Sequence, residues 1–260
     1  MKSFNNRVVV ITGAGSGIGA AAARLFHSRG WFVGLYDLNL DSVRKLAQEL
    51  NGSSRAGHVD VTDRHSVQGA IDDFTAACKG RLDVVLNNAG LFQDKPFMSA
   101  DADCLELMMR VNMEGIVHVA RAAHPWLKQT PDSHLVNMGS ASSIYGVPNS
   151  AIYSATKFFV RGLTEALRIE WEQDDITVNV VMPSYVATPM TDGIQLSHDH
   201  SGQLLTAGQV AEAVWQAANS PGMYWVLPRM SRIQWWLVRK LPLAWVPGFA
   251  RKVFARGLNE

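Results

Sequence analysis

Short apolar runs alternate with longer amphipathic segments along most of the chain. Most runs are rich in Val, Ile and Leu and are stopped by Gly, Asn or Asp, a pattern typical of strands buried on both faces of a sheet. The predicted strands cover residues 7–12, 31–36, 55–59, 82–87, 133–139, 176–182 and 223–227. Between them, apolar residues recur at helical spacing, which predicts helices over residues 17–29, 41–50, 63–78, 101–126, 150–173 and 207–219.

This alternation predicts an α/β fold, a Rossmann-type doubly wound parallel sheet of about seven strands flanked by helices. Parallel neighbours need a crossover, and a helix on a right-handed crossover supplies it. We expect residues 1–228 to form this domain and its ligands to bind at the carboxyl ends of the strands. The apolar run at residues 8–11 is too short for a signal peptide, and no stretch is long enough for a membrane span. Two cysteines cannot form a disulfide framework, so we expect a cytoplasmic location.

A glycine-rich loop joins the first predicted strand to the first predicted helix, with the sequence Thr-Gly-Ala-Gly-Ser-Gly-Ile-Gly over residues 12–19. Glycines let a backbone turn sharply and approach a pyrophosphate, and the N–H groups at a helix N-terminus favour negative charge. A glycine-rich turn without a ligand is the alternative, and the position between a strand and a helix argues against it. The residues expected to hold a dinucleotide here are Gly13, Ser16, Gly17, Ile18 and Gly19.

Asp37 ends the second predicted strand, 18 residues after Gly19, and Leu38 follows it. A carboxylate at this place accepts hydrogen bonds from the ribose diol of an adenosine, and it repels a 2′-phosphate. Neither Leu38 nor the glycine-rich loop offers a cation for such a phosphate. We therefore expect both residues to contact NAD rather than NADP, although a cap on the strand-to-helix turn would also explain Asp37.

Two further loops follow strands at the same predicted edge of the sheet. Asp60 and Val61 come after the third strand, where a side-chain oxygen could meet the adenine amino group. Asn88, Ala89 and Gly90 come after the fourth strand, where small side chains leave room for the adenosine half of the cofactor. Asn and Gly are common turn residues, so these loops gain weight from their shared place at the sheet edge.

Tyr153 and Lys157 are four residues apart in one predicted helix and so share a face. A nearby ammonium favours phenolate over phenol and lowers a tyrosine pKa, which suits Tyr153 to proton exchange with an alcohol or ketone. Ser140 follows the fifth predicted strand and could hydrogen-bond the same oxygen. Asn112 lies among apolar residues of the long fourth helix, where a buried amide needs a partner. A lone Tyr-xxx-Lys pair is common on helix surfaces, but Ser140 and the glycine-rich loop favour catalysis.

Together these motifs resemble those of the short-chain dehydrogenase/reductase family, in its single-domain, NAD-preferring form, over about residues 6–228. The glycine-rich loop resembles the cofactor loop of the family, and Asn87–Gly90 resembles its Asn-Asn-Ala-Gly motif. The spacing also matches the catalytic tetrad of the family at Asn112, Ser140, Tyr153 and Lys157.

The resemblance implies a role for each member of the tetrad. Tyr153 would exchange a proton with the substrate oxygen. Lys157 would hold the nicotinamide ribose and depress the Tyr153 pKa. Ser140 would position the substrate, and Asn112 would anchor a water in a proton relay to Lys157.

The loop after the sixth predicted strand also matches the family. The Val186 backbone and Thr188 would fix the carboxamide of the nicotinamide. Ser184 departs from the glycine that the family usually has after the proline, which puts the backbone path near the nicotinamide in doubt.

The family resemblance places the substrate near residues 141–149, 185 and 189–206. The last of these stretches favours a hydrophobic secondary alcohol or ketone, because it carries Met190, Ile194, Leu196, Leu204 and Leu205. His198 and His200 also lie there, but without further ligands they predict a solvated loop and no metal.

The last part of the chain, residues 229–260, differs from the rest in charge and composition. The formal net charge of +1 is the sum of −5 for residues 1–228 and +6 for residues 229–260, and four of the eight tryptophans lie at or after Trp225. Apolar residues recur at helical spacing between basic ones, so we expect an extension of amphipathic helices. Such helices suit the surface of an anionic bilayer, here the inner membrane surface. The alternatives are packing on the body, covering the pocket or forming a dimer contact.

Other functions fit the sequence less well. An NADPH-dependent lipid or ketoacyl reductase is opposed by Asp37, and a non-catalytic nucleotide-binding scaffold is opposed by the complete tetrad. Nucleic acid is not an expected partner, because the acidic body would oppose the approach of phosphates and the tail has no recognisable module. We expect a homodimer or a homotetramer, with the tail favouring the dimer.

Overall fold

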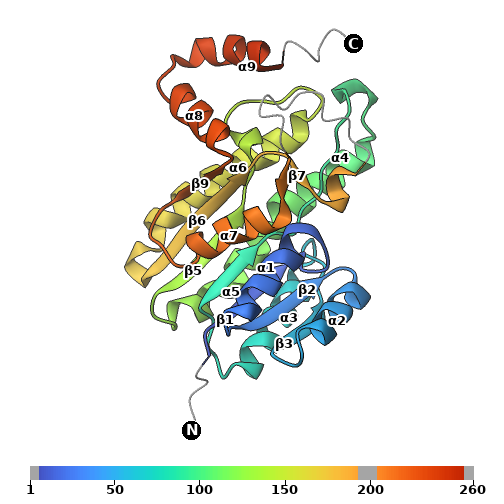
Figure 1. Ribbon diagram of the computed structural model, residues 1–260, viewed down its shortest axis with the longest axis vertical. Coiled ribbons are helices and arrows are strands. Elements are labelled where there is room, and N and C mark those ends of the chain that lie inside the picture. Colours follow the sequence, from blue (N-terminus) through green and yellow to red (C-terminus); the bar gives the residue numbers. More distant parts are fainter. Residues whose placement is uncertain (1–5, 193–203, 255–260) are drawn as a thin grey trace.

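The computed structural model describes residues 6–192 and 204–254, and it contains the predicted parallel sheet. Its strands are β1 (Val8–Thr12), β2 (Phe32–Asp37), β3 (Ser54–His58), β4 (Val84–Asn87), β5 (Ser133–Met138), β6 (Ile176–Pro183) and β9 (Tyr224–Leu227). They pair in the order β3-β2-β1-β4-β5-β6-β9, and every pair is parallel (Figure 1). The strand order reverses between β1 and β4, which is where a doubly wound sheet forms its ligand crevice.

Helices cover both faces of this sheet. They are α1 (Gly17–Ser28), α2 (Leu40–Glu49), α3 (Arg64–Ala77), α5 (Gly115–Lys128), α6 (Ala151–Glu170) and α7 (Ala207–Ala217). Successive side chains of a strand point to opposite faces, so Val9 and Ile11 of β1 pack with α1, α2 and α7. Val8 and Val10 pack instead with α3 and α5. All residues of β1 are buried, which explains why the strand reads as an unbroken apolar run.

One predicted helix is interrupted. Where the sequence predicts a single helix over residues 101–126, the structure has α4 (Ala102–Met109), a π-helical turn (Arg110–Glu114) and then α5. The prediction was wrong on continuity because apolar spacing does not reveal one extra residue in a turn. Such turns occur often at functional sites, and this one carries the buried Asn112.

Short elements fill the loops between the main strands and helices. β7 (Val186–Ala187) and β8 (Leu205–Thr206) pair with each other as a separate two-stranded sheet. Single 3-10 turns span Phe97–Ser99, Ala141–Ser143, Glu172–Asp174 and Pro189–Thr191. The expected apolar lid is described only in part, because Ile194, Leu196, His198 and His200 lie outside the described residues.

The C-terminal extension contains α8 (Arg229–Val238), a 3-10 turn (Leu243–Trp245) and α9 (Val246–Phe254). Figure 1 shows α8 and α9 in red at one end of the molecule, beyond β9. They pack on a small core cluster that includes Ile144, Tyr145 and Val160. The division at residue 228 remains an interpretation. Within the described ranges, none of the helices has both the length and the apolar character that crossing a bilayer requires.

Candidate active site

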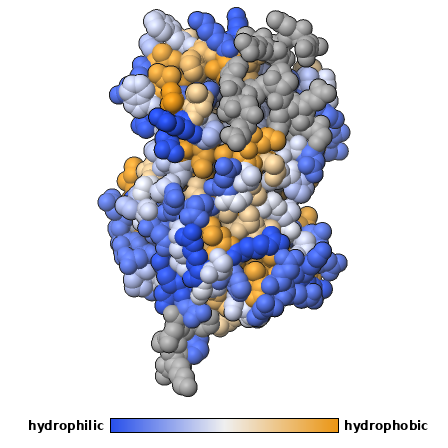
Figure 2. Space-filling model, in the orientation of Figure 1, coloured by the Kyte–Doolittle hydropathy of each residue, from blue (hydrophilic) through white to orange (hydrophobic). Residues whose placement is uncertain are grey.

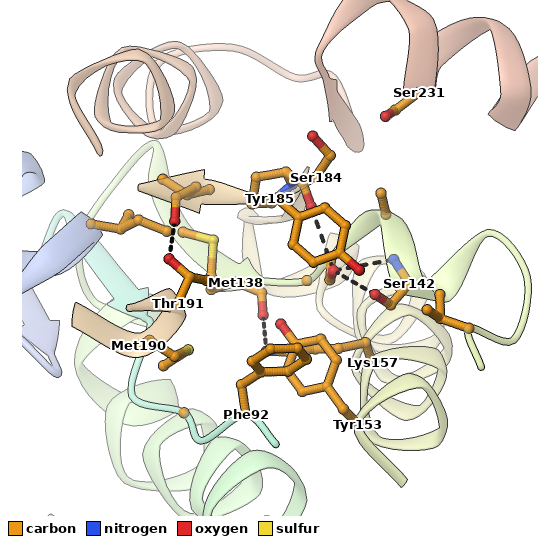
Figure 3. Close-up of a pocket in the computed structure, with 18 of the residues that line it drawn as sticks. Phe92, Met138, Ser142, Tyr153, Lys157, Ser184, Tyr185, Met190, Thr191 and Ser231 are labelled. Atoms are coloured by element: carbon orange, nitrogen blue, oxygen red, sulfur yellow. Dashed lines mark hydrogen bonds between the residues drawn. The ribbon is translucent and has the colours of Figure 1, made fainter. Parts of the chain in front are cut away.

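A cavity opens at the carboxyl ends of β4, β5 and β6. Its wall brings together residues that the sequence analysis took from several separate motifs (Figure 3). The expected site residues that line it are Ile18, Asn88, Gly90, Ser140, Tyr153, Lys157, Val186 and Thr188. The doubly wound fold therefore collects the glycine-rich loop, the loop after β4 and one face of α6 around a single space.

The glycine-rich loop is shaped to leave the N-terminus of α1 open. Gly17 has φ +51°, a left-handed conformation that side chains disfavour. A Cβ on Gly19 would lie 2.0 Å from the Gly13 carbonyl oxygen, so no side chain fits there. The Ser16 side chain forms no capping hydrogen bond, whereas Asn39 and Asp63 cap α2 and α3. Uncapped N–H groups at a helix N-terminus suit a pyrophosphate, so the loop fits a dinucleotide.

The loop after β4 is tied to the glycine-rich loop. Asn88 Nδ2 donates to the carbonyls of Thr12 and Gly13 at 3.0 and 3.1 Å. Thr12 Oγ1 in turn accepts from the N–H groups of Asn88 and Ala89 at 3.1 and 3.2 Å. These four hydrogen bonds fix the two loops relative to each other.

The Asp37 carboxylate holds two backbone groups. Oδ2 accepts from the Gly15 N–H and Oδ1 accepts from the Asn39 N–H, each at 2.9 Å. Asp37 therefore does cap the strand-to-helix turn, as the alternative interpretation expects. Leu38 is 66% exposed beside it, and the shallow hollow formed by residues 37–41 contains no Lys or Arg.

Asp60 and Val61 lie next to the sheet edge and outside the cavity wall. Asp60 Oδ1 accepts from the Thr62 N–H and hydroxyl at 2.8 and 2.7 Å. The Val61 carbonyl lies 2.9 Å from His118 Nδ1. Both residues therefore shape the turn after β3, and Asp60 retains one carboxylate oxygen outside this turn.

Tyr153 and Lys157 project from one face of α6 into the cavity, as the sequence predicts. Lys157 is buried and its Nζ donates to the Met138 carbonyl at 2.9 Å. The Phe92 ring meets the Tyr153 ring edge-on, with 4.7 Å between the ring centres. Figure 3 shows Phe92, Tyr153 and Lys157 together on one side of the cavity, with Tyr185 and Ser184 on the other.

The expected lowering of the Tyr153 pKa by Lys157 is wrong for this arrangement. Burial raises the pKa of Tyr153 to about 12, because desolvation disfavours the phenolate, and the Ser140 hydroxyl offsets only part of this rise. Burial lowers the pKa of Lys157 to about 8. The Lys157 ammonium lies 5.4 Å from the centre of the Tyr153 ring and donates to Met138, so it does not offset the desolvation. Tyr153 is therefore a neutral phenol with a proton to give at neutral pH.

Ser140 lines the cavity and holds backbone, whereas Asn112 holds backbone and does not line the cavity. Ser140 Oγ accepts from the Ser142 N–H at 3.1 Å at the start of the turn after β5. Asn112 is fully buried, and its amide bonds both backbone groups of Leu91, at 2.7 and 2.8 Å. The structure thus gives Asn112 a clamping contact that the sequence analysis did not foresee.

Several wall residues were missed by the sequence analysis. Phe92 and the tail residues Ser231, Gln234, Val253 and Phe254 line the cavity. The amphipathic pattern of the tail contained the signal, since covering the pocket was one of its open readings, but periodicity cannot say which surface a helix covers.

Ser184 follows β6 and lines the cavity. Its N–H donates to the Leu227 carbonyl at 2.9 Å, and its hydroxyl is buried with no hydrogen-bond partner among the described residues. The serine in place of the usual glycine therefore keeps β6 and β9 joined.

Comparison with known proteins places this geometry in a family. A family model described as short chain dehydrogenase matches residues 7–198. The chain is 37% identical to meso-2,3-butanediol dehydrogenase from Serratia marcescens over 211 residues, which cover 80% of this chain and 83% of the relative. It is 34% identical to 3-oxoacyl-(acyl-carrier-protein) reductase from Thermotoga maritima over 231 residues, which cover 85% of this chain and 94% of the relative.

Solved structures agree with these relatives. The 3-ketoacyl-(acyl-carrier-protein) reductase from Brucella melitensis complexed with NADH superposes with a TM-score of 0.80 at 26% identity, covering 86% of this chain and 98% of that chain. A short-chain dehydrogenase/reductase from Burkholderia phymatum in complex with NAD gives the same TM-score at 25% identity, covering 92% and 94%. The family model spans most of the chain and both sequence relatives exceed 30% identity, so this protein is an oxidoreductase of the short-chain dehydrogenase family.

Proposed function

We propose that the protein transfers a hydride between NAD(H) and a hydrophobic secondary alcohol or ketone, with Tyr153 as general acid/base. The observation that carries this proposal is the meeting of Tyr153, Lys157 and Ser140 in the cavity that the glycine-rich loop also borders. A nicotinamide bound there would accept or deliver the hydride at the substrate carbon. The phenol would take or give the proton on the substrate oxygen, so that alcohol and ketone interconvert with one hydride and one proton.

The four tetrad residues would divide the proton transfer between them. With its pKa raised to about 12, Tyr153 holds its proton at neutral pH, which is the form that would protonate a ketone oxygen, but the same rise makes the phenol a weaker acid. In the direction of alcohol oxidation, the phenolate would need a positive charge close by, and Lys157 would provide it only by moving from the Met138 carbonyl toward the Tyr153 hydroxyl. Ser140 would donate to the same substrate oxygen, and Asn112 would fix the loop that carries Leu91. The proposed water relay would pass from Asn112 to Lys157.

NAD rather than NADP is the proposed cofactor. The support is Asp37 at the end of β2, in a hollow without a basic side chain. A 2′-phosphate there would meet a carboxylate and no cation. The proposed contacts of NAD are those with Gly13, Ser16, Gly17, Ile18, Gly19, Asp37, Leu38, Asp60, Val61, Asn88, Ala89, Gly90, Tyr153, Lys157, Val186 and Thr188.

The apolar part of the cavity wall supports a hydrophobic substrate. Leu91, Phe92, Val147, Met190 and Phe254 supply it. The relative from Serratia marcescens is named for a secondary alcohol, whereas the relative from Thermotoga maritima is named for a ketoacyl group. A ketoacyl reductase is therefore the second candidate. Asp37 argues against the form of it that uses NADPH. We propose a cytoplasmic homodimer or homotetramer.

A substrate panel tests this function directly. Secondary alcohols of increasing apolar size are oxidised with NAD or with NADP at equal concentration, and the reduced cofactor is followed by absorbance. We expect turnover that rises with apolar size and an NAD preference of about tenfold or more, from repulsion at Asp37. A preference for NADP would contradict the cofactor assignment, and no turnover of any secondary alcohol would contradict the proposed substrate class.

A further inference from the structure

The C-terminal cap, defined here as residues 229–254, has two different faces. Its inner face belongs to the active-site cavity, where Ser231, Gln234, Val253 and Phe254 form part of the wall. Gln234 Oε1 accepts a hydrogen bond from the Tyr145 hydroxyl at 3.1 Å. Other inner-face residues pack on the core cluster beneath, namely Trp235, Val238, Val246, Phe249 and Ala250.

The outer face of the cap is an exposed apolar patch. Its large side chains are Met230, Ile233, Trp236, Leu237, Leu243 and Trp245. Leu243 is 88% exposed, Trp245 is 66% exposed and Trp236 is 60% exposed. These six are nearly half of the fourteen exposed large apolar residues found in the described part of the chain. Scattered exposed apolar residues are ordinary, but a concentration of this kind marks an interaction surface.

The cap is also basic. The cap contains Arg229, Arg232, Arg239, Lys240, Arg251 and Lys252, and no acidic residue occurs between positions 229 and 254. None of these six cations forms an ion pair with an Asp or Glu of the described ranges. Arg239 lies over the rings of Tyr224 and Trp235. Figure 2 shows hydrophobic and strongly hydrophilic residues side by side over the end of the molecule that α8 and α9 form.

We propose that the outer face of the cap docks on an anionic phospholipid bilayer. The positive charge complements anionic headgroups, and tryptophan favours the level of the headgroups. Leu243 and the other apolar side chains would enter the acyl boundary, as in helices that lie in the plane of a membrane. An acidic protein surface would match the cations, but it would leave Trp236, Leu243 and Trp245 against polar groups.

Docking through this face brings lipid close to the active site. A single helix, α8, separates the outer face from the cavity, because Trp236 is exposed on one side of it and Gln234 lines the cavity on the other. An apolar alcohol or ketone dissolved in the bilayer would thus be concentrated at the cap. This consequence for substrate supply rests on the proposed function, whereas the docking itself does not.

Vesicle flotation with the full-length protein tests the docking. One set of vesicles contains equal parts of phosphatidylglycerol and phosphatidylcholine, and the other contains phosphatidylcholine alone. We expect the protein to float with the first set and to lose at least tenfold in binding to the second. Raising the salt concentration should release it, because exposed charges are screened.

Two cap variants locate the contact. In the first, Trp236, Leu243 and Trp245 are replaced by Ser, all at positions at least 60% exposed. In the second, Lys240, Arg251 and Lys252 are replaced by Gln, and we expect about fivefold weaker binding per charge, or about a hundredfold in total. The apolar variant should lose binding at least tenfold.

Matched control variants change the body in the same way. Phe97→Ser with Met98→Ser removes exposed apolar side chains, and Arg44→Gln with Lys45→Gln and Arg64→Gln removes exposed cations. Both controls should float like the unaltered protein, and thermal unfolding should show every variant folded. No flotation, equal flotation with neutral vesicles, or cap variants that float like the controls would each overturn the proposal. Flotation is measured without turnover, so a failed substrate panel leaves this result untouched.

A contact between two copies is the competing occupant of the face. Size-exclusion chromatography without vesicles distinguishes it. If the cap variants convert a dimer into a monomer while the unaltered protein ignores vesicles, the face is a subunit interface and the bilayer proposal is wrong.

Discussion

The sheet body and the C-terminal cap are built by different physical rules. In the body, every residue of β1 and β5 is buried. In the cap, Ser231 is the one fully buried residue of α8, and α9 has no fully buried residue. The body carries a net negative charge and the cap region a net positive one. We therefore expect the cap to contribute less to folding stability than the body does.

The two walls of the cavity are held in place by different contacts. The wall from α6 and the loop after β4 belongs to the folding core, and its side chains are locked by several partners. The wall from α8 and α9 rests on contacts such as Tyr145 with Phe249, 5.8 Å between ring centres. The proposed chemistry would use the side chains of the first wall, and the proposed substrate selection could change on the second.

The strongest expected contrast is between Tyr153→Phe on the body side and Gln234→Leu on the cap side. Loss of the phenolic hydroxyl should lower kcat by about 10²–10⁴-fold, since the general acid/base is gone. Gln234→Leu removes only the acceptor for Tyr145 and should change kcat by less than about tenfold. Cofactor binding, followed by tryptophan fluorescence, should survive both. Substantial turnover by Tyr153→Phe would refute its role.

A second contrast compares two buried aromatic contacts. Phe74 is fully buried in the body beside Phe32 and Tyr36, so Phe74→Ala should lower the free energy of unfolding by about 3–5 kcal/mol. Phe249→Ala in the cap should cost only about 1 kcal/mol, mostly its contact with Tyr145. Chemical denaturation of both variants measures the difference. Equal losses would show that the cap is part of the folding core.

The pH dependence of folding stability tests how strongly Lys157 is desolvated in the body-side wall of the cavity. Lys157 has its pKa lowered from 10.5 to about 8 by burial, so between these values the unfolded chain binds a proton that the folded chain has released. Stability therefore rises with pH across that window, by up to about 1.4 kcal/mol per pH unit. Below pH 8 both states are protonated and the penalty is constant.

Lys157→Met is the reference for this measurement. Subtracting its free energy of unfolding from that of the unaltered protein at pH 7, 8, 9 and 10 isolates the lysine. The difference should be flat up to about the folded pKa and then increase in favour of the unaltered protein. A difference that stays flat to pH 10 would mean that the ammonium is not desolvated.

The smallest expected effect concerns substrate size. Phe254 lines the cavity from the cap, so Phe254→Ala should lower kcat/KM for a large apolar alcohol by about tenfold. A small secondary alcohol, which does not reach the cap, should be affected less. Phe97→Ala, exposed and outside this cavity, serves as the control. An equal loss for large and small alcohols would place the effect elsewhere than in substrate fit.

The sequence predicted most strands and helices of the body and the amphipathic helices of the cap, but it did not predict how the cap packs. Strands such as β1 carry short apolar runs, and helices such as α1 and α6 begin at Gly17 and Ala151, so the hydrophobic pattern and the residues that interrupt it locate them. The sheet edge brings Ser140, Tyr153, Lys157 and Ile18 of the glycine-rich loop to one cavity, whereas Asn112 is not among the residues that line it. The interruption around Asn112 left no trace in apolar spacing.

The pKa of Tyr153 and the orientation of the cap could not be predicted from the spacing of residues along the chain. The pKa of Tyr153 depends on how completely α6 and its neighbours exclude water, which a pair of residues four apart does not reveal. The cap offered two amphipathic helices, but which side faces the cavity depends on Tyr145 and the core cluster below it. Long-range packing of this kind is set by partners far away in sequence.

The Asn112 side chain also has a consequence for how β4 ends. Its amide accepts from the Leu91 N–H and donates to the Leu91 carbonyl, which is the same two-way exchange that paired residues of neighbouring strands make. A single side chain thus replaces the backbone of a neighbouring strand as the hydrogen-bonding partner of Leu91. An aspartate of the same shape would keep the first bond and lose the second, so the position of the chain that leads to Phe92 depends on the nitrogen of one amide.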